Sequence, residues 1–427
     1  MKRRILKQEI HECIFENTTD RVTFEKQLSD WIIEKEKNGI KQHDPDWHKA
    51  KVLTIGGSSL ATVQGKNPYS NVFKIIGEKI GLSKFNGDIK TQWGNLFEDV
   101  IKRYVEHDKN CTILGEDLFV VGPPGTSYSP DGLTVLDYML EEPYEEEIIV
   151  DTPDGPQKTI TLTTMQVPKT SIVLVEFKCP YSRIPNGRPP IYYIPQVKMG
   201  LDLLQIPTIG LFIEGVFRRC SWEYLGNNPF YDKKLVSRSS GKSPLAYGLI
   251  GFYFDAKKYQ SMQYTSDIEA QKTKMFEAYI EEFVEFGDAT NTYMSNDLGE
   301  SSPELFTQIM DLFDKKIITA RYGDIVSVDD KYNTEIGYDT VNNNLSAFDK
   351  FCKENDYINL GILPWKLFRI DYNYITKEEN YLEPWLPKIN EIIDVVRECN
   401  IPENSETKMN IYNAYINRSI EGGFSDE

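Results

Sequence analysis

Residues 172–178 read Ile172-Val173-Leu174-Val175-Glu176-Phe177-Lys178, a β-branched apolar run that ends in an acid and an amine. Successive side chains of a β-strand point to opposite faces, so Leu174, Glu176 and Lys178 share one face. Four consecutive apolar residues predict a central strand, in which a charged pair needs partners. An acid and a lysine two positions apart more often form a solvated ion pair, so the strand alone does not establish a site.

A second acid, Asp131, lies in the strand-like segment Ser129-Pro130-Asp131-Gly132-Leu133. Carboxylates from two strands can hold a hard cation, and Mg²⁺ takes few protein ligands while it keeps several waters. Such a cation polarises a phosphoryl oxygen and lowers the pKa of a bound water, while Lys178 can orient that water or stabilise developing charge. The carbonyl of Phe177 is a further candidate ligand. The pattern is therefore the one that a metal-dependent phosphodiesterase needs.

Glu98 is a candidate for a third carboxylate. It belongs to a helical pattern at residues 92–105, in which Gly94 and Ile101 lie one turn away and place it at the border of the buried face. A lone helical Glu is more often a surface residue, so this assignment depends on the two acids of the strands.

Gln196 is a candidate for binding a water or a phosphate. It lies on a helical pattern at residues 191–204, closely downstream of Lys178. An amide at this position can reach the same pocket and form hydrogen bonds there. Alone, it would be an ordinary helical glutamine.

The segments around the central strand alternate between strand-like and helical patterns. The turn-forming sequence Pro153-Asp154-Gly155-Pro156 predicts a hairpin insertion near residues 140–170 that projects from the core. The remaining order predicts an α/β fold with helices on both sides of a central mixed sheet. The strand-like runs are 112–121, 127–136, 148–150, 159–163, 172–178, 209–216, 219–224 and 248–254, and the helical ones are 59–63, 71–80, 92–105 and 191–204.

Three regions are expected along the chain. Residues 1–44 form an N-terminal extension with an amphipathic helix at 24–35, and residues 45–260 form the core. After about residue 261 long amphipathic patterns, at 270–286 and 303–313, predict a separate and mainly helical C-terminal region up to residue 427.

Composition restricts the class of protein. The net charge of −17 argues against a protein that coats nucleic acid, unless the basic residues gather in one channel. Acidic residues concentrate at 141–147 and after residue 266, which leaves room for such a channel. The six cysteines are scattered and predict neither a zinc site nor disulfides. We find no membrane-spanning or secretory segment and expect an intracellular protein, in the cytoplasm or at a viral replication site.

Seven short segments appear in the order found in lambda exonuclease and the YqaJ-type viral recombinase nucleases, and the sequence resembles this family. The resemblance runs from Asp46 to Gln196, less than half of the chain. It implies a restriction-endonuclease-like PD-(D/E)xK core. The segments are Asp46-Trp47-His48-Lys49, Ile55-Gly56-Gly57-Ser58, Asn67-Pro68-Tyr69, Gly94 to Glu98, Ser129 to Leu133, Glu176-Phe177-Lys178 and Tyr193 to Gln196.

The family resemblance implies an enzyme, a metal-dependent 5′ to 3′ exonuclease on duplex DNA that makes single-stranded overhangs for recombination, repair or genome processing. It implies Mg²⁺, for which Mn²⁺ can substitute, held by Asp131, Glu176 and the Phe177 carbonyl with Glu98 nearby. Lys178 and Gln196 would then lie around the attacking water.

Family members bind the DNA 5′ phosphate with an arginine and two serines, which correspond here to Lys51, Ser58 and Ser129. Lysine keeps the charge but lacks the bidentate fork of arginine, which weakens the expectation of a 5′-phosphate preference. An alternative role for Ser58 and Ser59, about equally expected and compatible with phosphate binding, is to cap the helix before Leu60.

The resemblance also implies DNA ends as partner, a single-strand annealing protein, and a ring-shaped trimer whose channel gathers basic residues. The candidates for that channel are Lys66, Lys74, Arg183, Arg188 and Lys198. Three alternatives stay open at this point: an endonuclease with the same site, an RNA-degrading enzyme, and a catalytically silent module that binds DNA ends or a recombination partner.

Overall fold

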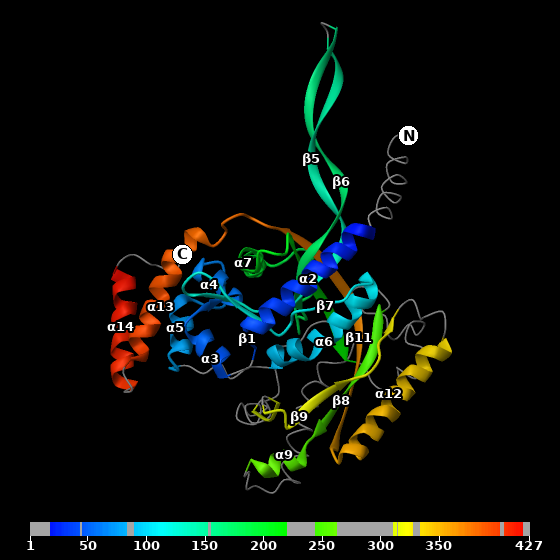
Figure 1. Cartoon of the computed structure of the whole chain (residues 1–427), viewed down its shortest axis with the longest axis vertical. Helices are drawn as coiled ribbons and strands as arrows, with labels where there is room; N and C mark the ends of the chain where they lie inside the picture. The colour runs from blue at the N-terminus through cyan, green and yellow to red at the C-terminus, as the bar shows by residue number, and fades with distance from the viewer. Residues whose placement is uncertain are drawn as a thin grey trace.

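The computed structural model describes residues 18–42, 45–82, 89–152, 155–219, 244–262, 311–313, 315–327, 334–401 and 405–421. Its centre is a seven-stranded mixed sheet with the strand order β10-β8-β11-β7-β6-β5, in which β9 also pairs with β8 (Figure 1). β6 and β7 are parallel and their neighbours are antiparallel. The strands are β5 (Gly132–Thr152), β6 (Gly155–Lys178), β7 (Ile209–Arg219), β8 (Ala246–Phe254), β9 (Ile318–Tyr322), β10 (Val326–Ser327) and β11 (Ile358–Thr376).

Two helical layers cover the sheet. On one face α6 (Ile89–Lys109) packs its apolar stripe, including Phe97 and Ile101, against Val173 and Val175 of β6. On the other face α4 (Gly57–Val63) and α7 (Ile194–Leu204) pack against Leu174. Alternate side chains of β6 thus belong to two hydrophobic cores, one on each face of the sheet. The expected α/β fold with a central mixed sheet flanked by helices is confirmed.

A smaller four-stranded sheet lies beside α4 and α7, with the order β1-β3-β4-β2. Its strand β2 runs parallel to β4, and α4 begins directly after β2. A Cβ atom on Gly57 would lie 2.7 Å from the ring of Tyr128, so only glycine lets α4 approach β4 this closely. The strands are β1 (Ile40–Lys41), β2 (Ile55–Gly56), β3 (Leu118–Val121) and β4 (Thr126–Tyr128), and the helices nearby are α3 (Pro45–Val52) and α5 (Val72–Lys79).

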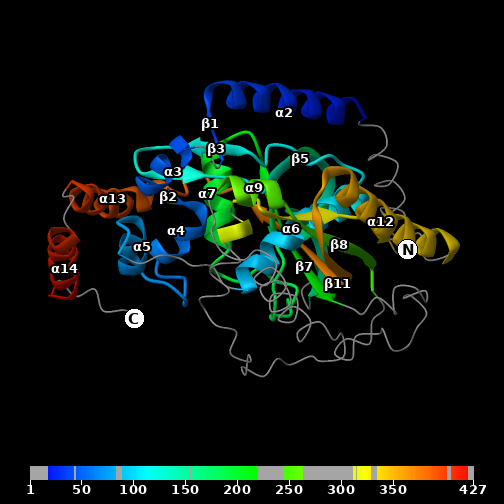
Figure 2. The same cartoon turned by 90° about the horizontal axis from the view of Figure 1, so that it is seen from below.

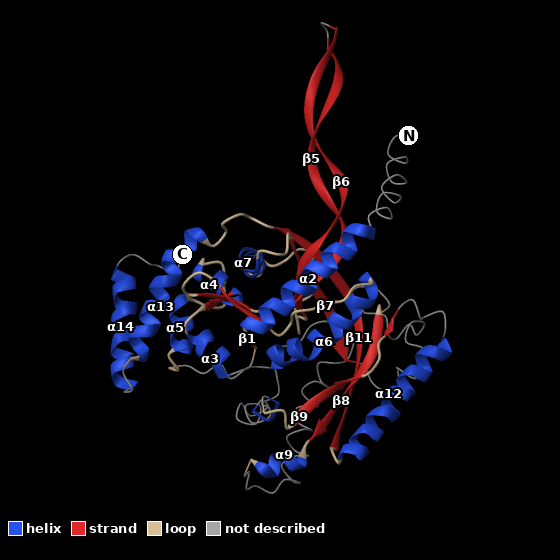
Figure 3. Cartoon of the chain, viewed as in Figure 1, coloured by secondary structure: helices blue, strands red, loops and turns tan. Residues whose placement is uncertain are grey.

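Strands β5 and β6 continue beyond the sheet as a long two-stranded hairpin (Figures 1 and 3). Their pairing runs without interruption from Gly132 opposite Val175 to Thr152 opposite Gly155. The projecting hairpin expected from the turn sequence is confirmed, and its two short strand-like runs are parts of much longer strands. Helix α2 (Thr18–Asn38) packs against the base of this hairpin and contains the amphipathic segment expected at 24–35.

The C-terminal residues differ from the separate helical region that the sequence patterns predicted. β11 lies between β7 and β8 and pairs with both, so residues far along the chain complete the central sheet. The apolar side chains of Trp365 and Leu367 are buried there, which explains the insertion. The remaining elements are α9 (Ala256–Ser261), α12 (Thr334–Asn355), the short 3₁₀ helix η3 (Glu383–Trp385), α13 (Leu386–Asn400) and α14 (Ser405–Glu421).

Helix α12 and the α13–α14 pair lie at opposite ends of the molecule (Figures 1 and 2). The predicted helix at 270–286, most of that at 303–313 and most of the strand at 219–224 lie outside the described residues. In the described part of the chain, no helix combines the length and the hydropathy that crossing a membrane requires.

Candidate active site

Glu176 is the centre of a buried polar cluster at the end of β6. Its side chain is 0% exposed and accepts hydrogen bonds from three different elements. The hydroxyl of Tyr128 in β4 lies 3.0 Å from Oε2, while Lys178 Nζ and Gln196 Nε2 both donate to Oε1. Gln196 comes from the first turn of α7. The structure thus brings together three of the predicted residues, Glu176, Lys178 and Gln196.

Asp131 lies beside this cluster, directly before β5. Its Oδ2 atom accepts a hydrogen bond from the backbone N–H of Phe177 at 2.7 Å and lies 3.8 Å from Lys178 Nζ. The carbonyl oxygen of Phe177 lies 2.9 Å from the same Nζ. Oxygens of Asp131, Glu176 and Phe177, three of the four candidate ligands, therefore surround one cationic nitrogen.

The electrostatics of the cluster reflect crowded carboxylates. Burial and the charge of Asp131 raise the pKa of Glu176 to about 7, against the opposing effects of Lys178 and the Tyr128 hydrogen bond. Burial alone would lower the pKa of Lys178, but the charges of Glu176 and Asp131 outweigh it and raise this pKa. Lys178 therefore stays protonated near neutral pH and does not act as a proton acceptor there.

Glu98 lies within the electrostatic reach of this cluster, on α6. The Glu98 residue is exposed at the surface, but partial desolvation by its surroundings and the charge of Asp131 raise its pKa to about 8. The residues that the structure describes contain no group of three or more His, Cys, Asp or Glu side chains placed to hold a metal ion. Glu98 is thus near the other two acids without forming a compact three-carboxylate set with them.

The predicted phosphate-binding residues come from segments that lie next to each other. A hydrogen bond of 2.7 Å between the hydroxyls of Thr54 and Ser127 ties the segment after Lys51 to β4, two residues before Ser129. Ser58 is exposed in the first turn of α4. The N-cap of α4 is Gly56 and it has no side-chain capping bond, so the alternative that Ser58 caps this helix is wrong.

Lys51 and Lys79 form a basic pair beside these serines. The Lys51 ammonium lies 4.3 Å from the ring centre of Trp47, and burial lowers its pKa. Lys79 Nζ donates to the carbonyl oxygens of Lys51 and Thr54, each at 2.7 Å. Burial and the charge of Lys51 lower the pKa of Lys79 to about 8. Lys79 thus fixes the backbone that carries Lys51.

The predicted basic channel residues differ in their surroundings. Arg183 donates to Glu214, and Lys198 donates to Glu378, so both charges are engaged by carboxylates. Lys66, Lys74 and Arg188 are exposed.

Sequence patterns missed three residues of this region: Tyr128, Glu214 and Lys79. Glu214 is 0% exposed on β7 and lies in register with Lys178 of β6. A single acid within the apolar run Ile209-Gly210-Leu211-Phe212-Ile213-Glu214-Gly215-Val216-Phe217 was an available signal. Nothing comparable distinguishes Lys79, whose role depends on two backbone carbonyls.

Comparisons with known proteins give three findings. No protein-family profile matches the chain. The chain is 32% identical over 220 residues to Protein D345L of African swine fever virus strain Badajoz 1971 Vero-adapted, and 33% identical to Protein D345L of isolate Tick/Malawi/Lil 20-1/1983. In each case the match covers 50% of this chain and 61% of the relative's length. An alkaline exonuclease (LHK-Exo) from Laribacter hongkongensis matches with a TM-score of 0.26 and 16% identity, over 40% of this chain and 73% of the enzyme.

Proposed function

We propose that this chain is a metal-dependent exonuclease that degrades duplex DNA from the 5′ end and leaves single-stranded overhangs. The observation that carries the proposal is the convergence of three oxygens, from Asp131, Glu176 and the Phe177 carbonyl, on the Lys178 ammonium. A lysine among acids on a central strand, beside an amide from the next helix, can supply the charge stabilisation and the water orientation that hydrolysis of a phosphodiester needs.

The donor set of this cluster fits Mg²⁺ or Mn²⁺. All three candidate donors are oxygens, which these hard cations prefer, and they already surround a positive charge. Desolvation and the charge of Asp131 raise the pKa values of Glu176 and Glu98, and a cation bound among these acids would favour their ionised forms. A bound cation would polarise the phosphoryl oxygen and promote ionisation of a water.

The side chains around the cluster have distinct proposed roles. Lys178, which stays protonated, stabilises the negative charge that develops on the phosphate. Gln196 and Tyr128 hold the two oxygens of Glu176 in fixed directions, so that this carboxylate is oriented before the substrate arrives. Lys51, Ser58 and Ser129 bind the terminal phosphate of the strand to be cut.

The finer parts of the proposal rest on the family resemblance of the sequence motifs. These are the 5′ to 3′ direction, the role in recombination, repair or genome processing at a viral replication site, a single-strand annealing protein as partner, and assembly into a trimer. The similarity to Protein D345L of African swine fever virus favours a viral setting.

The test is digestion of end-labelled DNA by the full chain with Mg²⁺. Linear duplex with and without a 5′ phosphate, nicked and circular duplex, and RNA of the same sequence are compared. We expect release of nucleotides from 5′ ends of linear duplex, and a loss of at least about 100-fold in Glu176→Gln. Glu354→Gln, which changes an exposed glutamate of α12, is the matched control and keeps full activity.

Three other outcomes would each assign a different activity to this chain. Digestion of circular duplex as fast as linear duplex would identify an endonuclease, and preferential digestion of RNA would identify a ribonuclease. Binding of DNA ends without cleavage in Mg²⁺ or Mn²⁺ would identify a silent binding module.

A further inference from the structure

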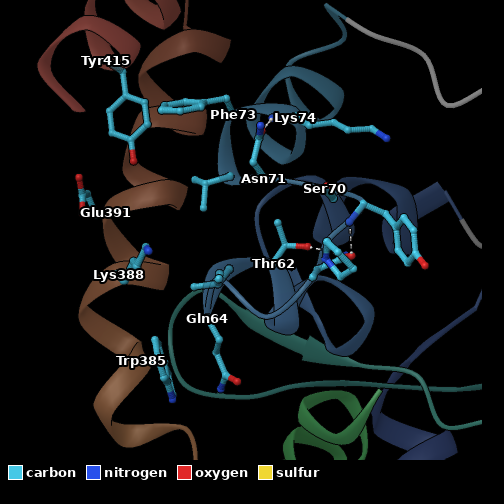
Figure 4. Close-up of a pocket in the computed structure, with 16 residues that line it drawn as sticks. Thr62, Gln64, Ser70, Asn71, Phe73, Lys74, Trp385, Lys388, Glu391 and Tyr415 are labelled. Carbon is cyan, nitrogen blue, oxygen red and sulfur yellow. Dashed lines mark hydrogen bonds between the residues drawn. The ribbon is translucent and has the colours of Figure 1, made fainter. Parts of the chain in front are cut away.

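A pocket of about 670 Å³ lies between the α4–α5 connection and the C-terminal helices (Figure 4). One wall is the connection at residues 64–71. Trp385, Lys388 and Glu391 form the opposite wall, and Phe73 and Tyr415 lie at one end. A volume of this size is typical of pockets that bind organic ligands. The metal-site candidates Asp131, Glu176 and Lys178 are not among the residues that line it.

A row of aromatic rings connects this pocket with the candidate active site. Tyr69, in the α4–α5 connection, makes an edge contact with Tyr192 at a centroid distance of 5.6 Å. Tyr192 contacts Tyr193 at 4.6 Å, and the Lys178 ammonium lies 5.5 Å from the Tyr193 ring centre. Contacting side chains therefore link the wall of the pocket to the catalytic cluster.

The row begins at a largely exposed ring, while the rings of Tyr192 and Tyr193 are half-buried. Tyr69 is 74% exposed, and Ile191, next to Tyr192, is 62% exposed. Single exposed apolar residues are common, but Tyr69 also contacts Tyr192 beside a site for which DNA is the proposed substrate. Exposed rings next to each other offer flat faces on which unpaired bases can stack.

The polar residues of the pocket suit a strand that is bound irrespective of its sequence. The amide of Asn67 is occupied by Thr62 and the backbone of Tyr69, and that of Gln64 by Tyr381, so these groups are not available to read bases. Lys66, on the connection, and Lys74, in α5, are exposed, and in Figure 4 Lys74 extends away from α13. Cations at the rim suit a phosphate backbone, while the rings suit the bases.

We infer that Tyr69, Tyr192 and Trp385 form a binding site for single-stranded DNA that continues from the catalytic cluster into the pocket. The inference rests on the proposed function for the choice of DNA as ligand. Paired bases keep their faces stacked on each other, so this site discriminates in favour of single strands. Binding there retains the unpaired strand next to the site at which its partner strand is cut.

The test measures binding of fluorescent DNA by anisotropy, with the full chain in EDTA so that no strand is cut. Blunt duplex is compared with the same duplex that carries a tail of about ten deoxythymidines, on the 3′ or the 5′ strand. For the wild type we expect a tail of at least one polarity to increase affinity about tenfold. Tyr69→Ala and Trp385→Ala lose most of this increase without a change in blunt-duplex affinity.

Two control variants separate stacking from a loss of structure. Tyr69→Phe keeps the ring and retains the effect of the tail. Tyr374→Ala removes a ring that stacks on Tyr138 at 4.9 Å, outside the row of rings described above, and leaves the effect unchanged. Equal binding of blunt and tailed duplex by the wild type, or an equal loss of affinity for both in Tyr69→Ala, would overturn the inference. Failure of the proposed function has a different signature, because Mg²⁺ would then produce no digestion while binding to tails persisted.

Discussion

The hydroxyl of Tyr128 donates a hydrogen bond to Oε2 of Glu176 across 3.0 Å, inside the protein, between β4 of the small sheet and β6 of the large one. This bond lowers the pKa of Glu176 and so favours the ionised carboxylate, against the effects of burial and Asp131. Tyr128 therefore couples the position of the small sheet to the charge state of the proposed metal ligand.

Tyr128→Phe removes this donor and keeps the ring. A hydrogen bond to a charged group contributes about 1.5 kcal/mol, so the pH midpoint for cation binding is expected to rise by about one pH unit. Titration of Mn²⁺ by calorimetry at several pH values measures it. Tyr138→Phe is the matched control, because its hydroxyl lies 3.1 Å from the Ser171 hydroxyl instead. An unchanged midpoint in Tyr128→Phe would show that this bond does not tune Glu176.

The cation-free protein should become less stable as the pH rises from about 4.5 to 8. Carboxyls of an unfolded chain lose their protons near pH 4.5, whereas in the fold Glu176 keeps its proton to about 7 and Glu98 to about 8. Between these values the folded state binds more protons than the unfolded state, so the free energy of unfolding decreases with pH and levels off above 8.

Thermal unfolding in EDTA and in Mg²⁺ across this pH range tests the linkage. Since a cation displaces those protons, the increase in Tm that Mg²⁺ causes should be larger at pH 8 than at pH 6. An increase in Tm that is independent of pH would contradict the assignment of these acids to the cation site. Glu176→Gln should remove the part of the pH dependence that arises below about pH 7 and leave the part that Glu98 contributes up to about pH 8, and it supplies the control.

Arg183 and Glu214 should be strongly coupled. The Glu214 carboxylate is 0% exposed and binds Arg183, whose side chain is 34% exposed. Arg183→Met leaves the buried Glu214 carboxylate without its cation, and we expect the free energy of unfolding to decrease by about 3 kcal/mol. This value is at the low end for buried ion pairs because the Arg183 side chain reaches solvent. The double variant Arg183→Met with Glu214→Gln should recover part of that loss. Urea unfolding of the four proteins measures the coupling, and strictly additive losses would refute it.

Local patterns were sufficient to predict the central strand and the residues next to it in space. The alternation at Leu174, Glu176 and Lys178 assigns one face of β6, and Gln196 meets that face from α7, the next described helix or strand along the chain after residues 179–193. Consecutive elements are usually adjacent in space, which makes such predictions dependable. The projecting hairpin was predictable for the same reason, since a turn sequence determines its own strands.

Contacts between distant segments could not be predicted in this way. The partners of Glu214 and Tyr128 depend on which strands lie next to each other in the two sheets. The local periodicity of the sequence does not encode that strand order. Lys79 acts on backbone carbonyls, and those carry no residue-type signal. The insertion of β11 was missed for a related reason: its strand pattern was overlooked among amphipathic helical patterns, and its two partners precede it by more than 100 residues.

The position of β11 predicts how truncation affects the chain. A protein that ends at residue 262 lacks β11, and the facing edges of β7 and β8 lose their partner while Trp365 and Leu367 no longer fill the core. Unpaired strand edges and exposed apolar surface promote aggregation, so this fragment should be insoluble or unfolded.

A protein that ends at residue 401 lacks α14 but keeps the whole sheet. It should remain folded, with a Tm lower by a few degrees, because the buried ring of Tyr415 is lost together with the hydrogen bond of 3.0 Å from Tyr412 to the Phe73 carbonyl. Circular dichroism and hydrogen exchange measure whether each of the two fragments is folded. A well-folded fragment of residues 1–262 would show that the core is independent of the C-terminal residues.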